Sequence, residues 1–91
     1  MNYKLLIRKQ AIEDINWFRK KDKQSHTKCF DLLLSIAENP REGIGHPERL
    51  KHYEEEVYSR QINKKDRIIY LIEEEEKLVS ITYCRGHYGD K

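Results

Sequence analysis

The sequence is poor in the residues that mark several classes of small protein. Its 91 residues include two cysteines, two prolines, four glycines and one tryptophan. Cys29 and Cys84 each fall in an apolar segment and form no Cys-x-x-Cys pair, so we expect buried thiols rather than a disulfide or a metal site. No apolar run reaches the length of a signal peptide core or a membrane span. We therefore expect a reduced, cytoplasmic protein.

Motifs for metals and nucleotides are also missing. The four histidines, at positions 26, 46, 52 and 87, show neither the His-Glu-x-x-His spacing nor that of a zinc finger. No Gly-x-Gly-x-x-Gly segment and no P-loop occur. The sequence therefore predicts no cofactor.

The chain also lacks a large excess of either charge, because the formal net charge is only +2 although 37% of the residues are charged. An excess this small does not by itself indicate a nucleic-acid partner, so the arrangement of the charges has to decide. Hydrophobic residues also make up 37% of the chain and recur periodically, which is typical of a folded protein. We expect one small domain over residues 1–91 with a compact core.

The periodicity predicts an α+β fold in which a helical hairpin packs on one face of a twisted, mostly antiparallel sheet of four to five strands. The expected helices cover residues 9–21 and 23–39, and the expected strands cover residues 3–7, 50–53, 57–62, 67–72 and 78–84. We expect Asp22 to cap the second helix and Trp17 to pack on the first. The apolar helix positions expected in the core are Ala11, Ile12, Ile15, Phe18, Cys29, Phe30, Leu33, Leu34, Ile36 and Ala37.

Glu48 is a candidate proton acceptor. It follows a proline in a loop with two glycines, and its neighbours in sequence are His46, Arg49, Lys51 and His52. A carboxylate held among cations stays ionised and can accept a proton. The plainer alternative is a solvated loop glutamate.

Arg60 and Arg67 flank the turn of a predicted hairpin, so they can lie close together. An arginine side chain presents planar donors that suit phosphate oxygens. The alternative is a sheet edge whose arginines pair with surface glutamates.

His87 and Tyr88 follow the last predicted strand. A histidine changes its charge near neutral pH, which suits a general acid. A tyrosine at such a place can stack on a base or hold a neighbour through its hydroxyl. Both residues could instead belong to a terminal tail without a chemical role.

Four short segments carry a family resemblance when they are taken together. They are GIGHPERLKH at 43–52, YSRQI at 58–62, DRIIY at 66–70 and CRGHY at 84–88. In this order they resemble the YoeB/Txe branch of the RelE/ParE toxin superfamily, over nearly the whole chain from about residue 3 to 88. The resemblance implies a RelE-like microbial ribonuclease fold and a toxin of a type II toxin–antitoxin module, which cleaves messenger RNA on the ribosome.

The resemblance also implies roles for particular residues. The family's catalytic positions fall on Glu48, Arg67, His87 and Tyr88, and its substrate-binding positions fall on Lys51 and Arg60. It implies a cognate antitoxin of the YefM/Axe kind, and it leaves open whether the free protein is a monomer or a homodimer. The chain departs from the family at Gln61, where a second arginine is usual, at Gly86, which is often aromatic, and in the extension 89–91.

The expected reaction is attack of a 2′-hydroxyl on the adjacent phosphate. Glu48 takes the proton of the hydroxyl, and Arg67, Lys51 and Arg60 stabilise the phosphorane. His87 protonates the leaving 5′ oxygen and Tyr88 orients the substrate, which yields a 2′,3′-cyclic phosphate without a metal.

Two other functions stay open from the sequence. A ParE-like toxin would inhibit DNA gyrase by binding and would need none of these acid and base groups. A degenerate relative would only bind its antitoxin, and the departures at Gln61 and Gly86 are compatible with that function.

Overall fold

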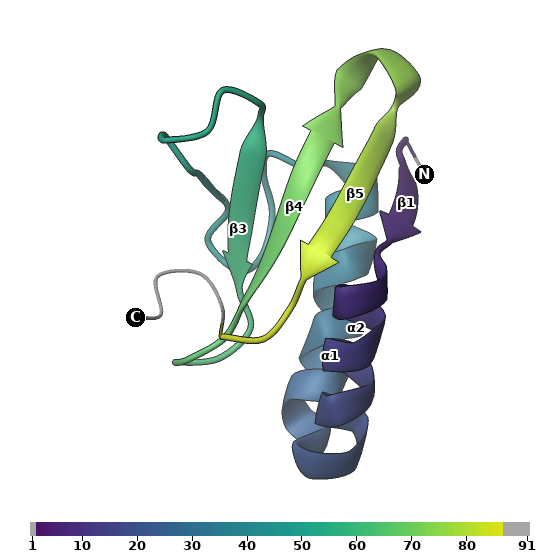
Figure 1. Cartoon of the computed structure of the whole chain (residues 1–91), viewed down its shortest axis with the longest axis vertical. Coiled ribbons are helices and arrows are strands. Elements are labelled where there is room, and N and C mark those ends of the chain that lie inside the picture. Colours follow the sequence, from purple (N-terminus) through teal and green to yellow (C-terminus); the bar gives the residue numbers. More distant parts are fainter. Residues whose placement is uncertain (1, 87–91) are drawn as a thin grey trace.

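The computed structural model describes residues 2–86 and shows a helical hairpin beside a five-stranded sheet (Figure 1). Its elements, in chain order, are β1 (Lys4–Ile7), α1 (Lys9–Lys21), α2 (Lys23–Glu38), β2 (Glu48–Arg49), β3 (Val57–Gln61), β4 (Arg67–Glu73), a 3₁₀ turn (Glu74–Glu76) and β5 (Leu78–Tyr83). The predicted fold class is confirmed. Among the described residues, no helix is long and apolar enough to cross a membrane.

The strands lie in the order β1-β5-β4-β3-β2, so β1 and β2 form the two edges of the sheet. The pairs β2–β3, β3–β4 and β4–β5 are antiparallel, because short turns connect β3 to β4 and β4 to β5. β1 pairs in parallel with β5, and both helices lie in the connection between them. The sheet is therefore mixed.

The predicted strand at 50–53 is wrong, because β2 consists of Glu48–Arg49. Ladder pairing runs only as far as Leu50, whose N–H donates to the carbonyl of Val57 at 2.8 Å. Residues 51–55 are exposed and include the acidic pair Glu54-Glu55, so they have no apolar side to place on the sheet. Glu48 thus belongs to an edge strand and not to a loop.

The two helices begin and end close to the predicted residues. Asp22 caps α2, since its carboxylate accepts from the backbone N–H of Ser25 at 3.1 Å. α2 ends at Glu38, and Pro40 follows its C-cap Asn39 because proline lacks the donor that another helical turn needs.

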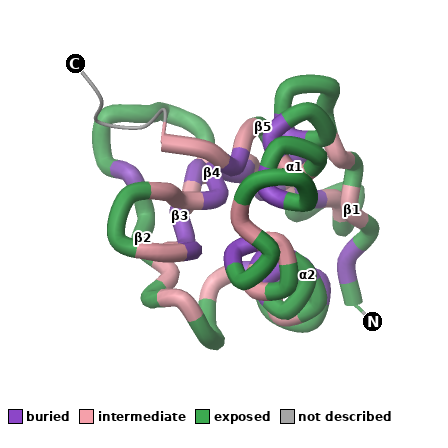
Figure 2. The backbone as a smooth tube through the Cα atoms, turned by 90° about the horizontal axis from the view of Figure 1, so that it is seen from below, coloured by how far each residue is buried: buried purple, intermediate pink, exposed green. Residues whose placement is uncertain are grey.

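The main core lies between the helices and the sheet, where Figure 2 shows the buried backbone gathered. Its largest apolar members include Phe18, Leu32, Ile36, Ile68 and Ile81.

Three apolar helix residues predicted for the core are exposed instead. The exposed fraction is 47% for Ile12, 49% for Phe30 and 61% for Leu34. Conversely, Asp14 is buried, although its charge suggested a place at the helix surface. The apolar stripe of each helix is wider than the side that the sheet covers, so periodicity alone did not fix which members are buried.

A second, smaller cluster covers the other side of the sheet. Leu50, Val57 and Ile69 are buried there, and Leu71 and Tyr83 pack against them. Residues of β4 alternate between the two clusters, as expected for a strand that is covered on both faces. We call the side away from the helices the open face.

Candidate active site

Glu48 and Arg67 lie on the same face of the sheet. Glu48 pairs with Ser59, and two residues further along β3 Gln61 pairs with Arg67. Directly paired residues share a face, and so do residues two apart on one strand. Ile69, two residues after Arg67, belongs to the cluster on the open face. The register therefore brings Glu48 and Arg67 together on the open face.

Glu48 and Arg67 are separated by the width of β3, which lies between their strands. Two strand separations and two residue steps put their Cα atoms about 12 Å apart. Glu48 is exposed and Arg67 is half-buried. Within residues 2–86, neither side chain forms a hydrogen bond or an ion pair with another side chain. A carboxylate and a guanidinium without side-chain partners among the described residues thus face the same side of the sheet.

Lys51 is an exposed turn residue that follows β2 after Leu50, so it lies at the β2 edge of the sheet near Glu48 in the chain. His52 and Tyr53 follow it and are also exposed, and their rings lie 5.2 Å apart. Lys51 is therefore only three residues from Glu48 and at the same edge of the sheet.

The end of β5 lies beside the start of β4. Tyr83 is paired with Ile69, and Arg67 begins β4 at that end of the sheet (Figure 1). The chain beyond Tyr83 therefore departs from a point close to Arg67. His87 and Tyr88 lie outside the described residues, so their place in the site stays a prediction.

Arg60 requires a correction. It is fully buried, and all three of its guanidinium nitrogens donate hydrogen bonds inside the protein. Their acceptors are the hydroxyls of Tyr70 and Ser35 and the carbonyls of Asn39, Glu42 and Ile44, at 2.6–3.0 Å. The predicted role of Arg60 in substrate binding does not fit this position, because its donors are occupied and no phosphate reaches them.

The buried charge of Arg60 sits at the end of α2. Asn39, which caps the C-terminus of that helix, accepts from Nη2 at 2.6 Å. Helix C-termini carry partial negative charge, and the last turn of α2 has no basic residue of its own. Burial raises the pKa of Tyr70 to about 12, so its hydroxyl stays protonated and donates to the carbonyl of Pro40 while it accepts from Arg60.

Arg60 therefore organises the loop that leads to Glu48. The alternation of β3 already put Arg60 on the same side as Tyr58 and Ile62, which pack in the main core. That pattern was the available sign of an interior arginine. Gln61 has the opposite orientation and stands on the open face opposite Arg67.

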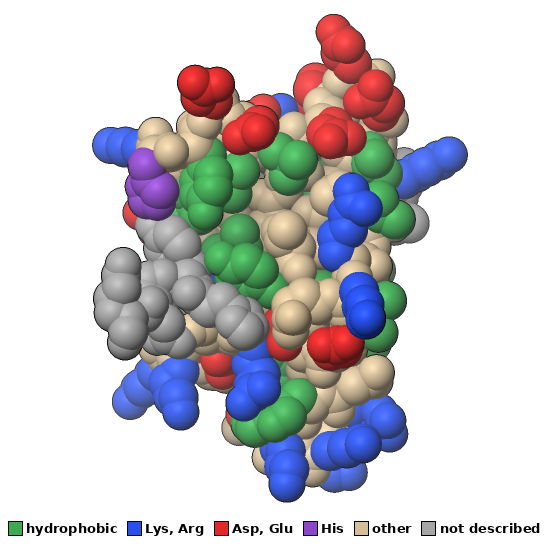
Figure 3. Space-filling view, in the orientation of Figure 1, with side chains coloured by type: hydrophobic (Ala, Val, Ile, Leu, Met, Phe, Trp, Pro, Cys, Tyr) green, Lys and Arg blue, Asp and Glu red, His purple; other side chains and the backbone are tan. Residues whose placement is uncertain are grey.

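Charge is segregated along the molecule although its total is small. Figure 3 shows acidic side chains gathered at one end and basic side chains at the other. The acidic end includes the 3₁₀ turn Glu74–Glu76, and the basic end includes the last turn of α1, with Arg19, Lys20 and Lys21. Exposed Lys64 and Lys65 lie in the turn directly before Arg67. The candidate site thus borders the basic end, which suits a polyanion.

The two cysteines are confirmed as free and buried. Contact with the Cys29 thiol, together with burial, raises the pKa of the Cys84 thiol, so the thiolate needed for nucleophilic chemistry is disfavoured.

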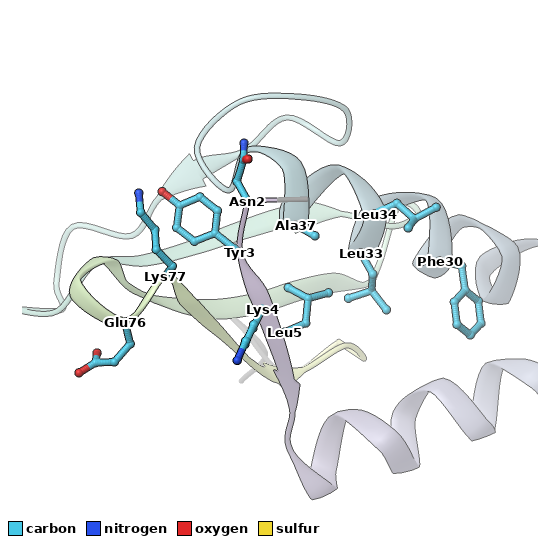
Figure 4. A pocket seen from close by; sticks show the side chains of 10 residues that line it. All are labelled: Asn2, Tyr3, Lys4, Leu5, Phe30, Leu33, Leu34, Ala37, Glu76 and Lys77. Carbon is cyan, nitrogen blue, oxygen red and sulfur yellow. The ribbon is translucent and has the colours of Figure 1, made fainter.

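A large apolar cavity lies away from the candidate site. It measures about 740 Å³ and opens between β1 and α2, with Tyr3, Leu5, Phe30, Leu33 and Leu34 in its wall (Figure 4). β1 and β2 are opposite edges of the sheet, so this cavity and Glu48 are separated by its full width. The cavity therefore takes no part in the chemistry considered at Glu48.

Comparison with known proteins gives a consistent result. Residues 7–88 match the family model described as the YoeB-like toxin of bacterial type II toxin–antitoxin systems. A curated relative, Toxin YoeB of Synechocystis sp. (strain ATCC 27184 / PCC 6803 / Kazusa), is 35% identical over 85 residues, which cover 93% of this chain and 96% of the relative.

Solved structures agree with the family match. The YoeB dimer from Staphylococcus aureus has a TM-score of 0.82 at 36% identity, over 97% of this chain and 100% of that one. The toxin in the heterotetrameric YoeB-YefM complex from the same organism has a TM-score of 0.79 at 36% identity, with the same coverage. The archaeal RelE-RelB complex from Pyrococcus horikoshii OT3 has a TM-score of 0.76 at 17% identity, over 99% of this chain and 100% of that one, and this likeness shows the RelE-like fold alone.

Proposed function

The chain belongs to the YoeB-like toxins of bacterial type II toxin–antitoxin systems, and from this premise we propose that it is a metal-independent endoribonuclease that cleaves messenger RNA on the ribosome. The observation that carries the proposal is the shared placement of Glu48 and Arg67 on the open face, with no side-chain partner for either within residues 2–86. A carboxylate and a guanidinium that no side chain of the described residues neutralises are available to a substrate.

The reaction follows from the chemistry of these groups. The RNA chain lies across β3 with its scissile phosphate beside Arg67, and the 2′-hydroxyl of the preceding nucleotide lies within reach of Glu48. Glu48 removes the hydroxyl proton as the oxygen attacks phosphorus, and Arg67 stabilises the added negative charge. Lys51 supports the phosphate from the β2 edge. Arg60 has no contact with the substrate and holds the loop that leads to Glu48 in place.

His87 completes the scheme as the general acid. It gives a proton to the departing 5′ oxygen, which leaves a 2′,3′-cyclic phosphate on one product and a 5′-hydroxyl on the other. Tyr88 orients the base or the phosphate. The ribosome supplies the surface that holds the message in line for attack, which removes much of the entropic cost of the reaction.

A protein partner follows from the same family membership. The YoeB from Staphylococcus aureus forms a heterotetrameric complex with YefM and has also been solved as a dimer. We propose a cognate antitoxin of the YefM/Axe kind for this chain, and a homodimer of the free toxin. Binding of the antitoxin over the open face would block access to Glu48 and Arg67.

Primer extension on a translated message tests the activity. We expect cleavage by the wild-type protein with ribosomes and none on the same RNA without them. Glu48→Gln and His87→Ala should each lower the cleavage rate by roughly 10²–10⁴-fold, the usual contribution of one acid or base. Glu38→Gln, which changes an exposed carboxylate at the end of α2, is the matched control and should cleave like wild type.

The competing function is tested beside it. A supercoiling assay with DNA gyrase should show no inhibition at toxin concentrations that cleave the message. Inhibition of gyrase without cleavage, or wild-type cleavage by Glu48→Gln, would overturn the proposal.

A further inference from the structure

The chain that leaves β5 is held by two residues of α1. The backbone N–H of Cys84 donates to the carboxylate of Asp14 at 2.9 Å. The guanidinium carbon of Arg85 lies 3.5 Å from the centre of the Trp17 ring, which is the geometry of a cation–π contact. Asp14 and Trp17 are three residues apart on a helix and therefore lie on one side of it. We call these two residues the tail clamp.

Asp14 is buried, so its hydrogen bond to Cys84 is formed inside the protein. Its exposed fraction is only 2%, and its second oxygen accepts from Gln10 at 3.0 Å. A buried carboxylate is costly unless hydrogen bonds compensate it, so a residue used only for packing would be apolar here. Strand pairing with β4 ends at Tyr83, and Asp14 takes over as the acceptor for the next N–H.

Trp17 also contacts the core through Phe18. Its ring meets Phe18 edge-on, with the centroids 5.7 Å apart, and Phe18 is completely buried. The tryptophan is 38% exposed, so it forms part of the surface rather than of the core. The sequence led us to expect that Trp17 only packs on the first helix. In the structure it also offers one ring face to Arg85.

We propose that Asp14 and Trp17 are positioning residues for the terminal pair His87 and Tyr88. The clamp fixes Cys84 and Arg85, and Gly86 then turns the chain with φ 51°, a conformation that favours glycine. His87 is joined directly to Gly86, so the clamp fixes the backbone as far as the residue before the proposed general acid. This inference rests on the proposed function, in which His87 is the general acid.

Kinetics of clamp variants test the inference. Trp17→Ala should lower the single-turnover rate of ribosome-dependent cleavage by roughly 10- to 100-fold, since a shift of about 1 Å in a catalytic group has effects of that order. The KM for the programmed ribosome should stay unchanged, and the loss of rate at alkaline pH that a histidine acid causes should become shallower. Trp17→Tyr keeps a ring face for Arg85 and should restore most of the rate. Phe30→Ala, which removes a 49% exposed aromatic from α2, is the matched control.

A double variant separates positioning from stability. Trp17→Ala should have no further effect in a His87→Ala background, because the acid it positions is already missing. A structural role would instead give additive losses in both backgrounds. In NMR spectra, the ring-current shift of the Arg85 side chain should disappear in Trp17→Ala, and the Gly86 amide should show faster internal motion.

The outcomes distinguish the clamp from the proposed function. If His87→Ala loses activity while Trp17→Ala keeps the wild-type rate and pH profile, the clamp inference is overturned and the nuclease proposal stands. If wild-type protein leaves the message intact, or His87→Ala cleaves it fully, the acid–base function fails and the positioning role fails with it.

Discussion

Nε of Arg60 lies 3.0 Å from the hydroxyl oxygen of Tyr70 in the interior of the protein. The same hydroxyl donates to the carbonyl of Pro40 at 2.7 Å, so two central strands are joined to the loop that leads to Glu48. An arginine that suggested substrate contact thus supports the candidate site from beneath, and the cation that faces outward is Arg67.

The two arginines should therefore respond oppositely to substitution. Arg60→Ala removes the donors for five neutral acceptors, and we expect a loss of about 3–5 kcal/mol in the free energy of unfolding, because a buried hydrogen-bond network is broken. Arg67→Ala should cost less than about 1 kcal/mol, because the residue lies at the surface of the open face. Urea unfolding measures both values and should show that Arg67→Ala is folded. Primer extension should show that this variant is inactive.

Arg60→Lys provides a further control. Lysine keeps the charge but cannot supply the planar set of donors, so it should be destabilising as well. A stable Arg60→Ala protein with weakened RNA binding would return Arg60 to the substrate site.

Gly45 lies where the loop before Glu48 packs against Leu32 of the core. Its φ is +84°, and a Cβ atom added there would lie 2.6 Å from Cδ2 of Leu32 and 3.2 Å from the carbonyl of Gln61. Gly45→Ala should therefore lower stability by roughly 1–3 kcal/mol and reduce cleavage, since this loop leads directly into the strand of Glu48. Thermal unfolding and primer extension check this, with the neighbouring exposed residue changed in Ile44→Ala as the control. Equal behaviour of the two variants would contradict it.

The sequence alone predicted most elements because their signals are local. Apolar periodicity located both helices, and Asp22 with its capping side chain located the start of α2. The parallel pairing of β1 with β5 carries no local signal, since it joins segments separated by the whole helical hairpin and three strands. Predicted strands at both ends of the chain are compatible with either direction.

The candidate site was predicted unevenly for a related reason. Glu48 and Arg67 followed from a motif, whereas their common face follows from the register of β2, β3 and β4. The tail clamp was not predicted from the sequence. The helix dipole stabilises an acidic residue near the start of a helix, so nothing in the sequence indicated a partner for Asp14. Only the tertiary structure shows that Asp14 is buried against Cys84.

Acid should weaken a cluster of charges at the end of the sheet that holds the 3₁₀ turn. Glu74 accepts from Lys77 at 2.6 Å and also from Tyr3 and Arg41, and these bonds lower the pKa of Glu74 to about 2. A carboxyl with a depressed folded-state pKa stabilises the protein above its ordinary pKa, and that contribution is lost as the pH falls toward about 2. The bidentate bond with Arg41 lowers the pKa of Glu56 and acts in the same direction.

Glu74→Gln isolates this contribution. The melting temperature of wild type should exceed that of the variant by a constant, modest amount above about pH 5, because the cluster is largely exposed. The difference should shrink as the pH falls below the ordinary pKa of 4.5 toward 2. Glu55→Gln, at an exposed position, should show no such trend. A difference for Glu74→Gln that grows in acid would contradict the assignment.

Gln61 offers a gain-of-function prediction. It is paired with Arg67 between β3 and β4 on the open face, and its amide donates a local bond to the carbonyl of Asn63 at 3.2 Å, its one side-chain hydrogen bond among residues 2–86. Gln61→Arg would put a second cation where the phosphate chain is proposed to lie. Affinity for single-stranded RNA made uncleavable by 2′-deoxy substitution should rise, and the plot of log K against log salt should steepen by roughly 0.7, the effect of one more neutralised phosphate. The two adjacent cations should also lower stability slightly, since like charges directly opposite each other in a sheet repel.

Thr27→Arg adds the same charge on α2, away from the open face, and should leave the slope nearly unchanged. Equal slopes for the two variants would mean that RNA does not cross the face between β3 and β4, whereas a steeper slope for Gln61→Arg alone would locate the polyanion beside Arg67.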